Sequence, residues 1–295
     1  MSKKIFITGV LKTATSSMVA ALNMHPNVYI GYELFDNERS RKQLIEVMPK
    51  VKNIFDKHGH SKESLYPSLE LFLTKSGYSY RYFGDKIAVC RDAVNIKTLN
   101  DLDKLGDYII FMIRDLQYWT AKMVRMDKTI RYFSTTTNIA EMICKYMTYF
   151  LSSYKFDLLR VDVDEFLDGN WIPRVSEYIG EPFEKYIGAW WKVGYKKGDP
   201  KSMNWKKKHP SSTVKPGKKD TKFITSDHEI WHEILPIFNK YHKNLDNSFG
   251  TKEIDNDIIS VKRITDKYNN LRPADLFSSL KCFDIEKNKL TLKVI

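Results

Sequence analysis

Long apolar runs are missing from the sequence. No apolar stretch approaches the roughly 18–20 residues that a membrane-spanning helix needs. The short run at residues 5–11 meets Lys12 too early for a secretory signal. Cysteine is also scarce, and the spacings of Cys90, Cys144 and Cys282 fit no metal-binding motif. We therefore expect reduced thiols, no metal site and a cytoplasmic protein without a membrane span.

Acidic residues are too few to balance the basic ones. The 295 residues hold 48 Lys and Arg against 36 Asp and Glu, a net charge of +12. Such a balance favours an anionic partner: nucleic acid, a membrane surface, or a small molecule bearing phosphate or sulfate. Residues 201–222 alone carry eight lysines and one acidic residue, hence +7. One basic loop fits closure over a small polyanion better than binding of nucleic acid.

Strand and helix patterns alternate along the first 250 residues. Short β-branched and aromatic runs predict strands, and apolar residues at helical spacing predict helices. The predicted strands are 4–9, 28–31, 80–89, 108–113 and 158–163, and the predicted helices are 16–24, 38–56, 61–75, 115–126, 137–153, 171–179 and 227–247. This order predicts a three-layer α/β fold: a central parallel sheet of about five strands, a P-loop-like phosphate-binding turn and flanking helices.

The end of the chain differs from the rest in composition. We expect residues 1–250 to form one domain, within which the lysine-rich stretch 199–222 is a long surface loop. Residues 251–295 are a C-terminal extension with a helical start and strand-like residues at 289–295. Its pattern fits either an appended hairpin or an element of a homodimer.

The loop after the first strand has the chemistry of a phosphate cradle. Backbone N–H groups at a helix N-terminus favour an anion. Lys12 adds a charge, and hydroxyl groups come from Thr13, Thr15, Ser16 and Ser17. The lysine comes early, unlike that of the NTPase loop G-x-x-x-x-G-K-[ST]. The same residues also suit an ordinary strand-to-helix turn, because Ser and Thr cap helices well.

This loop resembles the 5′-phosphosulfate loop of the sulfotransferase family, G-x-x-[KR]-[ST]-G-T-[ST]. Lys12-Thr13-Ala14-Thr15-Ser16 matches it, with Ala14 in place of glycine. An alanine is expected to need ordinary backbone angles there. Residues 22–28 (LNMHPNV) are similar to the segment that follows, L-x-x-H-P-x-[VI]. Glu33 then stands where tyrosine-protein and heparan-type sulfotransferases carry their catalytic base, although it also fits an exposed surface carboxylate.

Three further segments resemble the same family. Residues 109–115 are similar to the strand that ends in the 3′-phosphate arginine, here Arg114, which also fits a strand-end arginine paired with a surface carboxylate. Lys122 occupies the position of the family's serine, and Thr120 is a nearby substitute. Residues 83–86 resemble a G-[DE]-K segment whose lysine, here Lys86, lies near the donor sulfate. Residues 201–210 resemble the lysine-rich lid of carbohydrate sulfotransferases.

The resemblance covers about residues 4–250 and implies an activity. It implies transfer of a sulfuryl group from 3′-phosphoadenosine 5′-phosphosulfate (PAPS) to a hydroxyl or amine, without a metal, leaving adenosine 3′,5′-bisphosphate. Lys12 would stabilise the leaving phosphate, Lys86 would neutralise the sulfuryl oxygens, and Glu33 would accept the proton. The donor-binding residues implied are Lys12, Thr13, Ala14, Thr15, Ser16, Ser17, Arg114, Thr120, Lys122, Lys206, Lys207 and Lys208.

Five further residues, two histidines and three aromatic residues, have candidate roles. His25, which precedes a proline, is predicted to be a packing and turn residue, and His209 is an alternative base or a cap on the basic loop. Trp205, Tyr118 and Trp119 are candidates for stacking on adenine, with core packing favoured for Trp119.

Two other classes of function stay open. One is a Mg²⁺-dependent P-loop kinase of nucleotides or small molecules, and the other is a non-enzymatic module that binds polyanions. No acceptor signature is present, so a small molecule, a glycan and a peptide are all open.

Overall fold

The chain is described by a computed structural model that covers five main ranges. These are residues 3–33, 80–89, 96–130, 138–183 and 227–272, with isolated positions at 42, 45, 52, 275–276, 283–284 and 289–290. The chain divides into two compact units. The first comprises residues 1–89, 97–112 and 157–218, and the second comprises 90–96, 113–156 and 219–295.

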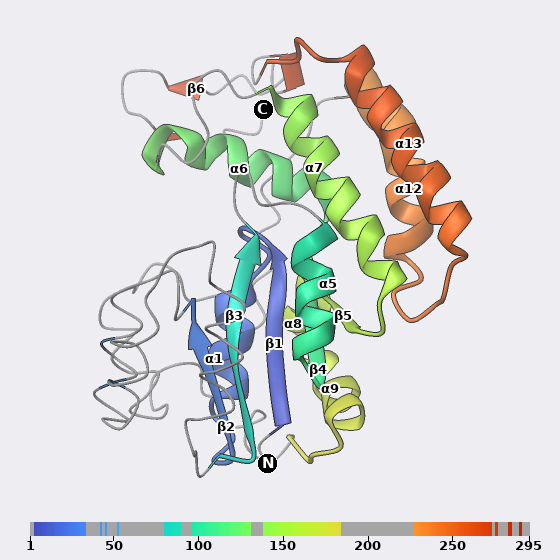
Figure 1. The fold of residues 1–295 in the computed structure, drawn as a ribbon. Coiled ribbons are helices and arrows are strands. Elements are labelled where there is room, and N and C mark those ends of the chain that lie inside the picture. The colour runs from blue at the N-terminus through green and yellow to red at the C-terminus, as the bar shows by residue number, and fades with distance from the viewer. Residues whose placement is uncertain are drawn as a thin grey trace. The chain divides into compact units, whose positions relative to one another are not determined.

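The first unit is built on a five-stranded sheet (Figure 1). Its strands are β1 (Lys3–Val10), β2 (Val28–Tyr32), β3 (Tyr82–Val89), β4 (Tyr108–Ile113) and β5 (Leu159–Asp162). The strand order is β2-β3-β1-β4-β5, and the sheet is parallel. The predicted α/β fold with a central parallel sheet of about five strands is therefore confirmed.

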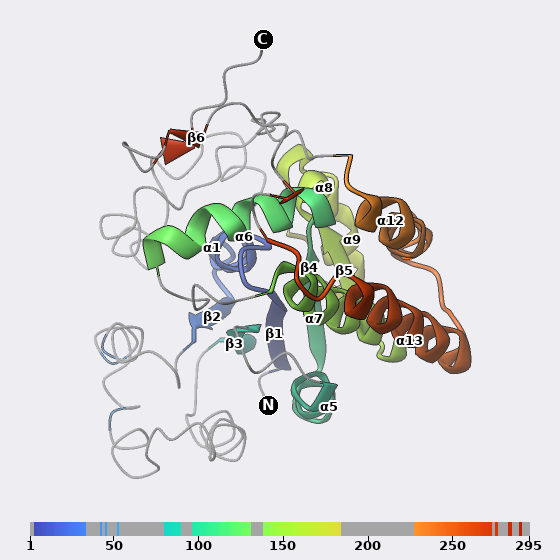
Figure 2. The ribbon, with the colours of Figure 1, turned by 90° about the horizontal axis from the view of Figure 1, so that it is seen from above.

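Helices cover both faces of this sheet, which explains the continuous apolar runs of β1 and β4. On one face Ile5, Ile7 and Met112 join a core formed with α1 (Thr15–Leu22), α8 (Val163–Asp168) and α9 (Trp171–Ile179). On the other lies α5 (Ile96–Leu105), and a Cβ at Gly106, just after this helix, would lie 2.9 Å from the ring of Phe6. Figure 2, viewed from above, shows α1 and α5 on opposite faces.

Four helices of the second unit lie within the main described ranges. They are α6 (Leu116–Ile130), α7 (Ile139–Ser152), α12 (Glu229–His242) and α13 (Thr251–Lys267), with a 3-10 turn, η3 (Ser153–Lys155), after α7. Helix α13 packs against α7 and α12. Lys240 of α12 lies 2.7 Å from carboxylate oxygens of both Glu253 and Asp257 of α13. The start of the predicted C-terminal extension is therefore packed against other helices of this unit.

The structure also bears on the other elements predicted from the sequence. The strand-like residues near the C-terminus form β7 (Lys289–Leu290), which pairs antiparallel with β6 (Phe283–Asp284). Helix α5 was not predicted. The predicted helices 38–56 and 61–75 lie almost wholly outside the described residues, as does the whole basic loop with Trp205, Lys206, Lys207, Lys208 and His209. No helix in the described ranges has both the length and the apolar character needed to cross a bilayer.

Candidate functional site

The loop between β1 and α1 has an unusual backbone. Lys12 and Ala14 both adopt left-handed conformations, with φ of 73° and 62°. The expectation that Ala14 keeps ordinary angles is therefore wrong. A side chain with a Cβ costs about 1–2 kcal/mol in this conformation. Gly9 has φ 149°, and a Cβ there would lie 2.5 Å from the carbonyl oxygen of Met112, so the turn requires glycine.

The start of α1 is suited to an anion. Its N-cap residue, Ala14, makes no side-chain hydrogen bond to the helix, and the first turn contains no acidic residue. The first N–H groups of a helix have no acceptor within the helix and carry the positive end of its dipole. An anionic group at this position would therefore receive backbone hydrogen bonds.

The four hydroxyl residues of the loop differ in their surroundings. Thr13 is fully buried, and its Oγ1 donates to the carbonyl oxygen of Val10 at 2.7 Å, which stabilises the turn. Thr15 and Ser17 are also buried. Ser16 is only half-buried, and its Oγ accepts a hydrogen bond of 3.2 Å from Lys86 Nζ. Ser16 is thus the least buried of the four hydroxyl residues.

Lys86 connects the loop to the end of β2. Its Nζ lies 2.7 Å from Glu33 Oε1, and the side chains are 8% and 29% exposed. The register explains this contact, because Lys86 on β3 is opposite Ile7 of β1 on one side and Tyr32 of β2 on the other. The structure therefore brings together three predicted site residues, Ser16, Glu33 and Lys86, from three separate segments.

Glu33 is held at its backbone as well as its side chain. Its N–H donates to the carbonyl oxygen of Lys86 at 3.2 Å, and its φ of 56° is left-handed. Strained residues of this kind cluster at active sites and ligand clamps. A partly exposed carboxylate next to an ammonium group can accept a proton beside a position where negative charge is stabilised.

The predicted 3′-phosphate residues belong to the second unit. Arg114 follows β4, and its guanidinium carbon lies 3.9 Å from the centre of the Tyr118 ring. Lys122 Nζ is 5.9 Å from the same ring. Thr120 is fully buried, and its hydroxyl donates to the carbonyl oxygen of Leu116 at 2.8 Å. Because the Thr120 hydroxyl is buried and already bonded to the helix backbone, Lys122 is the better candidate beside Arg114 for the 3′-phosphate.

The contact of Arg114 with Tyr146 was not predicted from the sequence. The hydroxyl of Tyr146 on α7 accepts a hydrogen bond of 3.1 Å from the N–H of Arg114 and donates to its carbonyl oxygen. In the sequence Tyr146 is one apolar-face residue of a helix 32 positions away, so no local pattern marks this contact.

Two predicted packing residues are confirmed. His25 is 3% exposed, its Nδ1 accepts a hydrogen bond of 3.2 Å from the N–H of Asn27, and its ring lies 4.9 Å from Phe183. Burial lowers the pKa of this imidazole. Trp119 is buried with its ring 4.5 Å from that of Tyr146.

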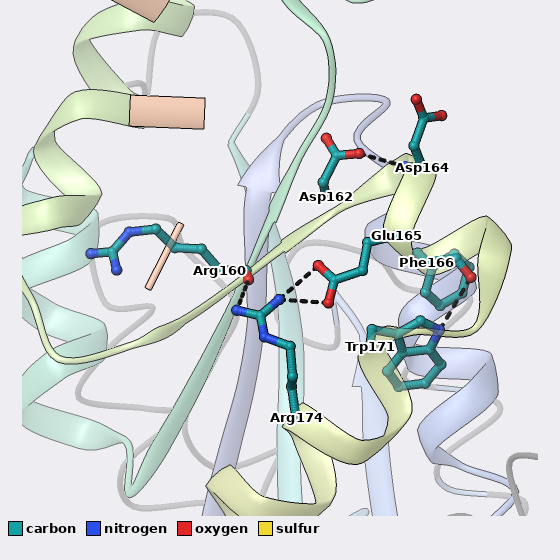
Figure 3. Close-up of polar contacts among 7 residues, drawn as sticks. All are labelled: Arg160, Asp162, Asp164, Glu165, Phe166, Trp171 and Arg174. Atoms are coloured by element: carbon teal, nitrogen blue, oxygen red, sulfur yellow. Dashed lines mark hydrogen bonds and ion pairs between the residues drawn. The ribbon is translucent and has the colours of Figure 1, made fainter. Parts of the chain in front are cut away.

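A polar cluster at the end of β5 is structural (Figure 3). Arg174 Nη1 contacts both carboxylate oxygens of Glu165 at 2.6 and 2.7 Å, and its Nη2 donates to the carbonyl oxygen of Arg160 at 3.1 Å. Asp162 Oδ1 caps α8 through the N–H of Asp164 at 2.6 Å. These contacts fasten α8 and α9 to β5. In the described part of the chain, no three His, Cys, Asp or Glu side chains gather as metal ligands would.

The chain was compared with known proteins by sequence and by structure, and only the structural comparison finds matches. No protein-family model and no curated protein matches the sequence. The solved structures that the chain resembles include two sulfotransferase domains. The domain from the curacin biosynthetic pathway is 11% identical, with a TM-score of 0.45 over 63% of this chain and 77% of the domain. The domain from a Synechococcus olefin synthase is 11% identical, with a TM-score of 0.46 over 92% and 96%.

Proposed function

We propose that the protein is a sulfotransferase that moves a sulfuryl group from PAPS to a hydroxyl or amine. The observation that carries this proposal is the contact of one buried ammonium, that of Lys86, with both Glu33 and Ser16. Transfer of an anionic group needs positive charge around that group and a proton acceptor nearby. The β1–α1 loop, Lys86 and Glu33 supply these at one place.

The residues present fit the phosphosulfate end of PAPS. The uncapped start of α1 and the hydroxyl of Ser16 are donors, and Lys12 and Lys86 are cations. In this proposal Lys12 and the helix start hold the 5′-phosphosulfate. Arg114 with Lys122 holds the 3′-phosphate, Tyr118 is the stacking candidate for adenine, and the basic loop closes over the nucleotide.

Each group at the centre has a defined role in this proposal. PAPS supplies the sulfuryl group when it is bound. Lys12 stabilises the charge that develops on the leaving phosphate, and Lys86 neutralises oxygens of the group in transfer and orients Glu33. Glu33 accepts the proton of the acceptor, which is a small molecule, a glycan or a peptide. We place the reaction in the cytoplasm on the basis of the sparse cysteines.

A thermal-shift panel tests this function. Adenosine 3′,5′-bisphosphate, ATP with Mg²⁺, GTP with Mg²⁺ and S-adenosylmethionine are compared at equal concentrations. At about 100 times its dissociation constant, the bisphosphate is expected to add roughly 2.7 kcal/mol of stability. Lys12→Ala is the control, because it is expected to reduce that shift.

Other outcomes of the panel contradict the proposal. A shift with ATP and Mg²⁺ but none with the bisphosphate would indicate a kinase. No shift with any nucleotide, together with strongly salt-dependent binding to a polyanion, would indicate a binding module. If the bisphosphate binds, a screen with labelled PAPS then identifies the acceptor.

A further inference from the structure

A single phenol satisfies both backbone polar groups of Arg114. The hydroxyl of Tyr146 accepts from the N–H of Arg114 at 3.1 Å and donates to its carbonyl oxygen. Arg114 lies between the end of β4 and the start of α6, where the backbone leaves one regular element before it enters the next. Tyr146 therefore fixes the position of the peptide groups on both sides of the Arg114 Cα atom.

Tyr146 itself has little freedom to move. It is 1% exposed, and its ring packs 4.5 Å from Trp119 and 6.5 Å from both Phe150 and Phe238. A side chain enclosed by aromatic rings holds its polar atom in one place. The hydroxyl of Tyr146 is thus a fixed point for the Arg114 backbone.

The residues after Arg114 are also held. Asp115 Oδ1 accepts a hydrogen bond of 2.8 Å from the N–H of Tyr118, which caps the start of α6. The guanidinium of Arg114 lies 3.9 Å over the ring of Tyr118. With the backbone fixed by Tyr146 and the planar group resting on a ring, the guanidinium has a defined direction before any ligand binds.

We infer that Tyr146 is a positioning residue for recognition of the 3′-phosphate by Arg114, an inference that rests on the proposed function. Pre-ordering a long side chain reduces the conformational entropy lost on binding. Without the Tyr146 hydroxyl, the N–H and the carbonyl oxygen of Arg114 lose their hydrogen-bond partner. The Arg114 guanidinium then samples more orientations. The affinity that depends on the 3′-phosphate then falls, whereas contacts to the rest of the nucleotide are kept.

The experiment compares two ligands that differ only at the 3′-position. Calorimetric titration gives the affinities for adenosine 3′,5′-bisphosphate and adenosine 5′-monophosphate, and their ratio measures 3′-phosphate recognition. Tyr146→Phe keeps the ring and is expected to lower this ratio by about three- to tenfold, the scale of one weakened charge-assisted contact. Arg114→Met is expected to lower the ratio more than Tyr146→Phe does, to the value that Lys122 alone supports.

Tyr154→Phe is the matched control. Tyr154 is also buried, and its hydroxyl donates to a backbone carbonyl of the same unit, that of Tyr241 at 2.7 Å. This variant is expected to lose a similar amount of stability and to keep the wild-type ratio. If Tyr146 had only a general structural role, both variants would change the affinity ratio by the same amount. That result would overturn the inference.

The outcomes separate this inference from the proposed function. A wild-type ratio near one contradicts the role of Arg114 in the proposed function and removes the basis of the inference with it. A high wild-type ratio that Arg114→Met lowers and Tyr146→Phe leaves unchanged overturns the inference alone. If Tyr146→Phe is too unstable to titrate, the inference is tested on the wild type. The hydrogen-exchange rate of the Arg114 amide is then measured without ligand and with each nucleotide. The bisphosphate is expected to protect the Arg114 amide more than the monophosphate does, and equal protection contradicts the inference.

Discussion

Lys86 and Glu33 form an ion pair in which the ammonium is almost buried and the carboxylate is partly exposed. Lys86 Nζ lies 2.7 Å from Glu33 Oε1, and Lys86 also contacts Ser16 of the β1–α1 loop. Burial of Lys86 without a partner would be costly, so the ion pair and the hydrogen bond together stabilise its charge. The partly exposed carboxylate remains accessible from solvent.

Replacement of Glu33 by glutamine tests its proposed role as the proton acceptor. Glu33→Gln keeps the shape of the side chain and removes its basicity. We expect the rate of sulfuryl transfer to fall about 10²- to 10⁴-fold, while the affinity for adenosine 3′,5′-bisphosphate is not weakened. The measurements are turnover with labelled PAPS and calorimetric titration.

The control for this variant lies in the same unit. Glu165→Gln removes another paired carboxylate, the partner of Arg174. We expect it to lower stability and to leave transfer unchanged in the folded protein. Full turnover by Glu33→Gln would show that another group accepts the proton.

The charge and the backbone conformation of Lys12 can be tested separately. Lys12→Ala and Lys12→Gly both remove the ammonium, and each is expected to weaken binding of adenosine 3′,5′-bisphosphate about tenfold or more. Because Lys12 has φ 73°, the glycine variant should be the more stable of the two. Calorimetric titration and urea unfolding measure the two effects, and unchanged affinity in both variants would exclude Lys12 from the donor site.

The left-handed conformation of Ala14 predicts a stabilising substitution. Ala14→Gly removes strain of about 1–2 kcal/mol and adds roughly 0.5–1 kcal/mol of backbone entropy to the unfolded chain. The net expectation is a gain of a few tenths to about 1 kcal/mol in the free energy of unfolding, measured with urea. Ala21→Gly, within α1, should instead lose about 1 kcal/mol. A loss for Ala14→Gly would contradict the loop geometry.

His25 predicts a loss of stability in acid. Burial lowers its pKa in the folded protein below the ordinary value of 6.5. As the pH falls below 6.5, the unfolded chain therefore takes up a proton before the folded protein does. The contribution of His25 is complete above pH 6.5 and declines as the pH falls toward the folded-state pKa.

His25→Asn is the test of this pH dependence. Asparagine retains an acceptor for the N–H of Asn27 but does not titrate. Urea unfolding at several pH values between about 7.5 and 5 should show a smaller decrease in stability for the variant than for the wild type. Equal decreases would assign the pH dependence to other groups.

Some elements of the fold follow directly from the sequence. Strands β1 and β4 are continuous apolar runs because helices cover both faces, and such runs with glycine or charged residues at their ends are readily recognised. Helix α5 is mostly polar and was missed. Its leucines at positions 99 and 102 are fully buried, and with the apolar residues at 96 and 105 they form a three-residue spacing that marks it.

The residues of the candidate site could be predicted from the sequence, but the contacts between them could not. The loop residues, Glu33 and Lys86 each stand at a strand end or on a strand, which motif comparison recovers. Their contact depends on β3 lying between β1 and β2 with Lys86 opposite Tyr32. Strand order and register arise from long-range pairing, which one sequence does not specify. The left-handed Ala14 likewise depends on packing that overrides local preference.

The position of β3 has a consequence for synthesis of the protein. β1 and β2 are complete once residue 32 has been made, yet both pair with β3 and not with each other. Hydrogen bonding between these three strands must therefore wait until residues 82–89 have left the ribosome. A chain that stalls before that point exposes two unpaired apolar strands, which are ready substrates for chaperones and for aggregation.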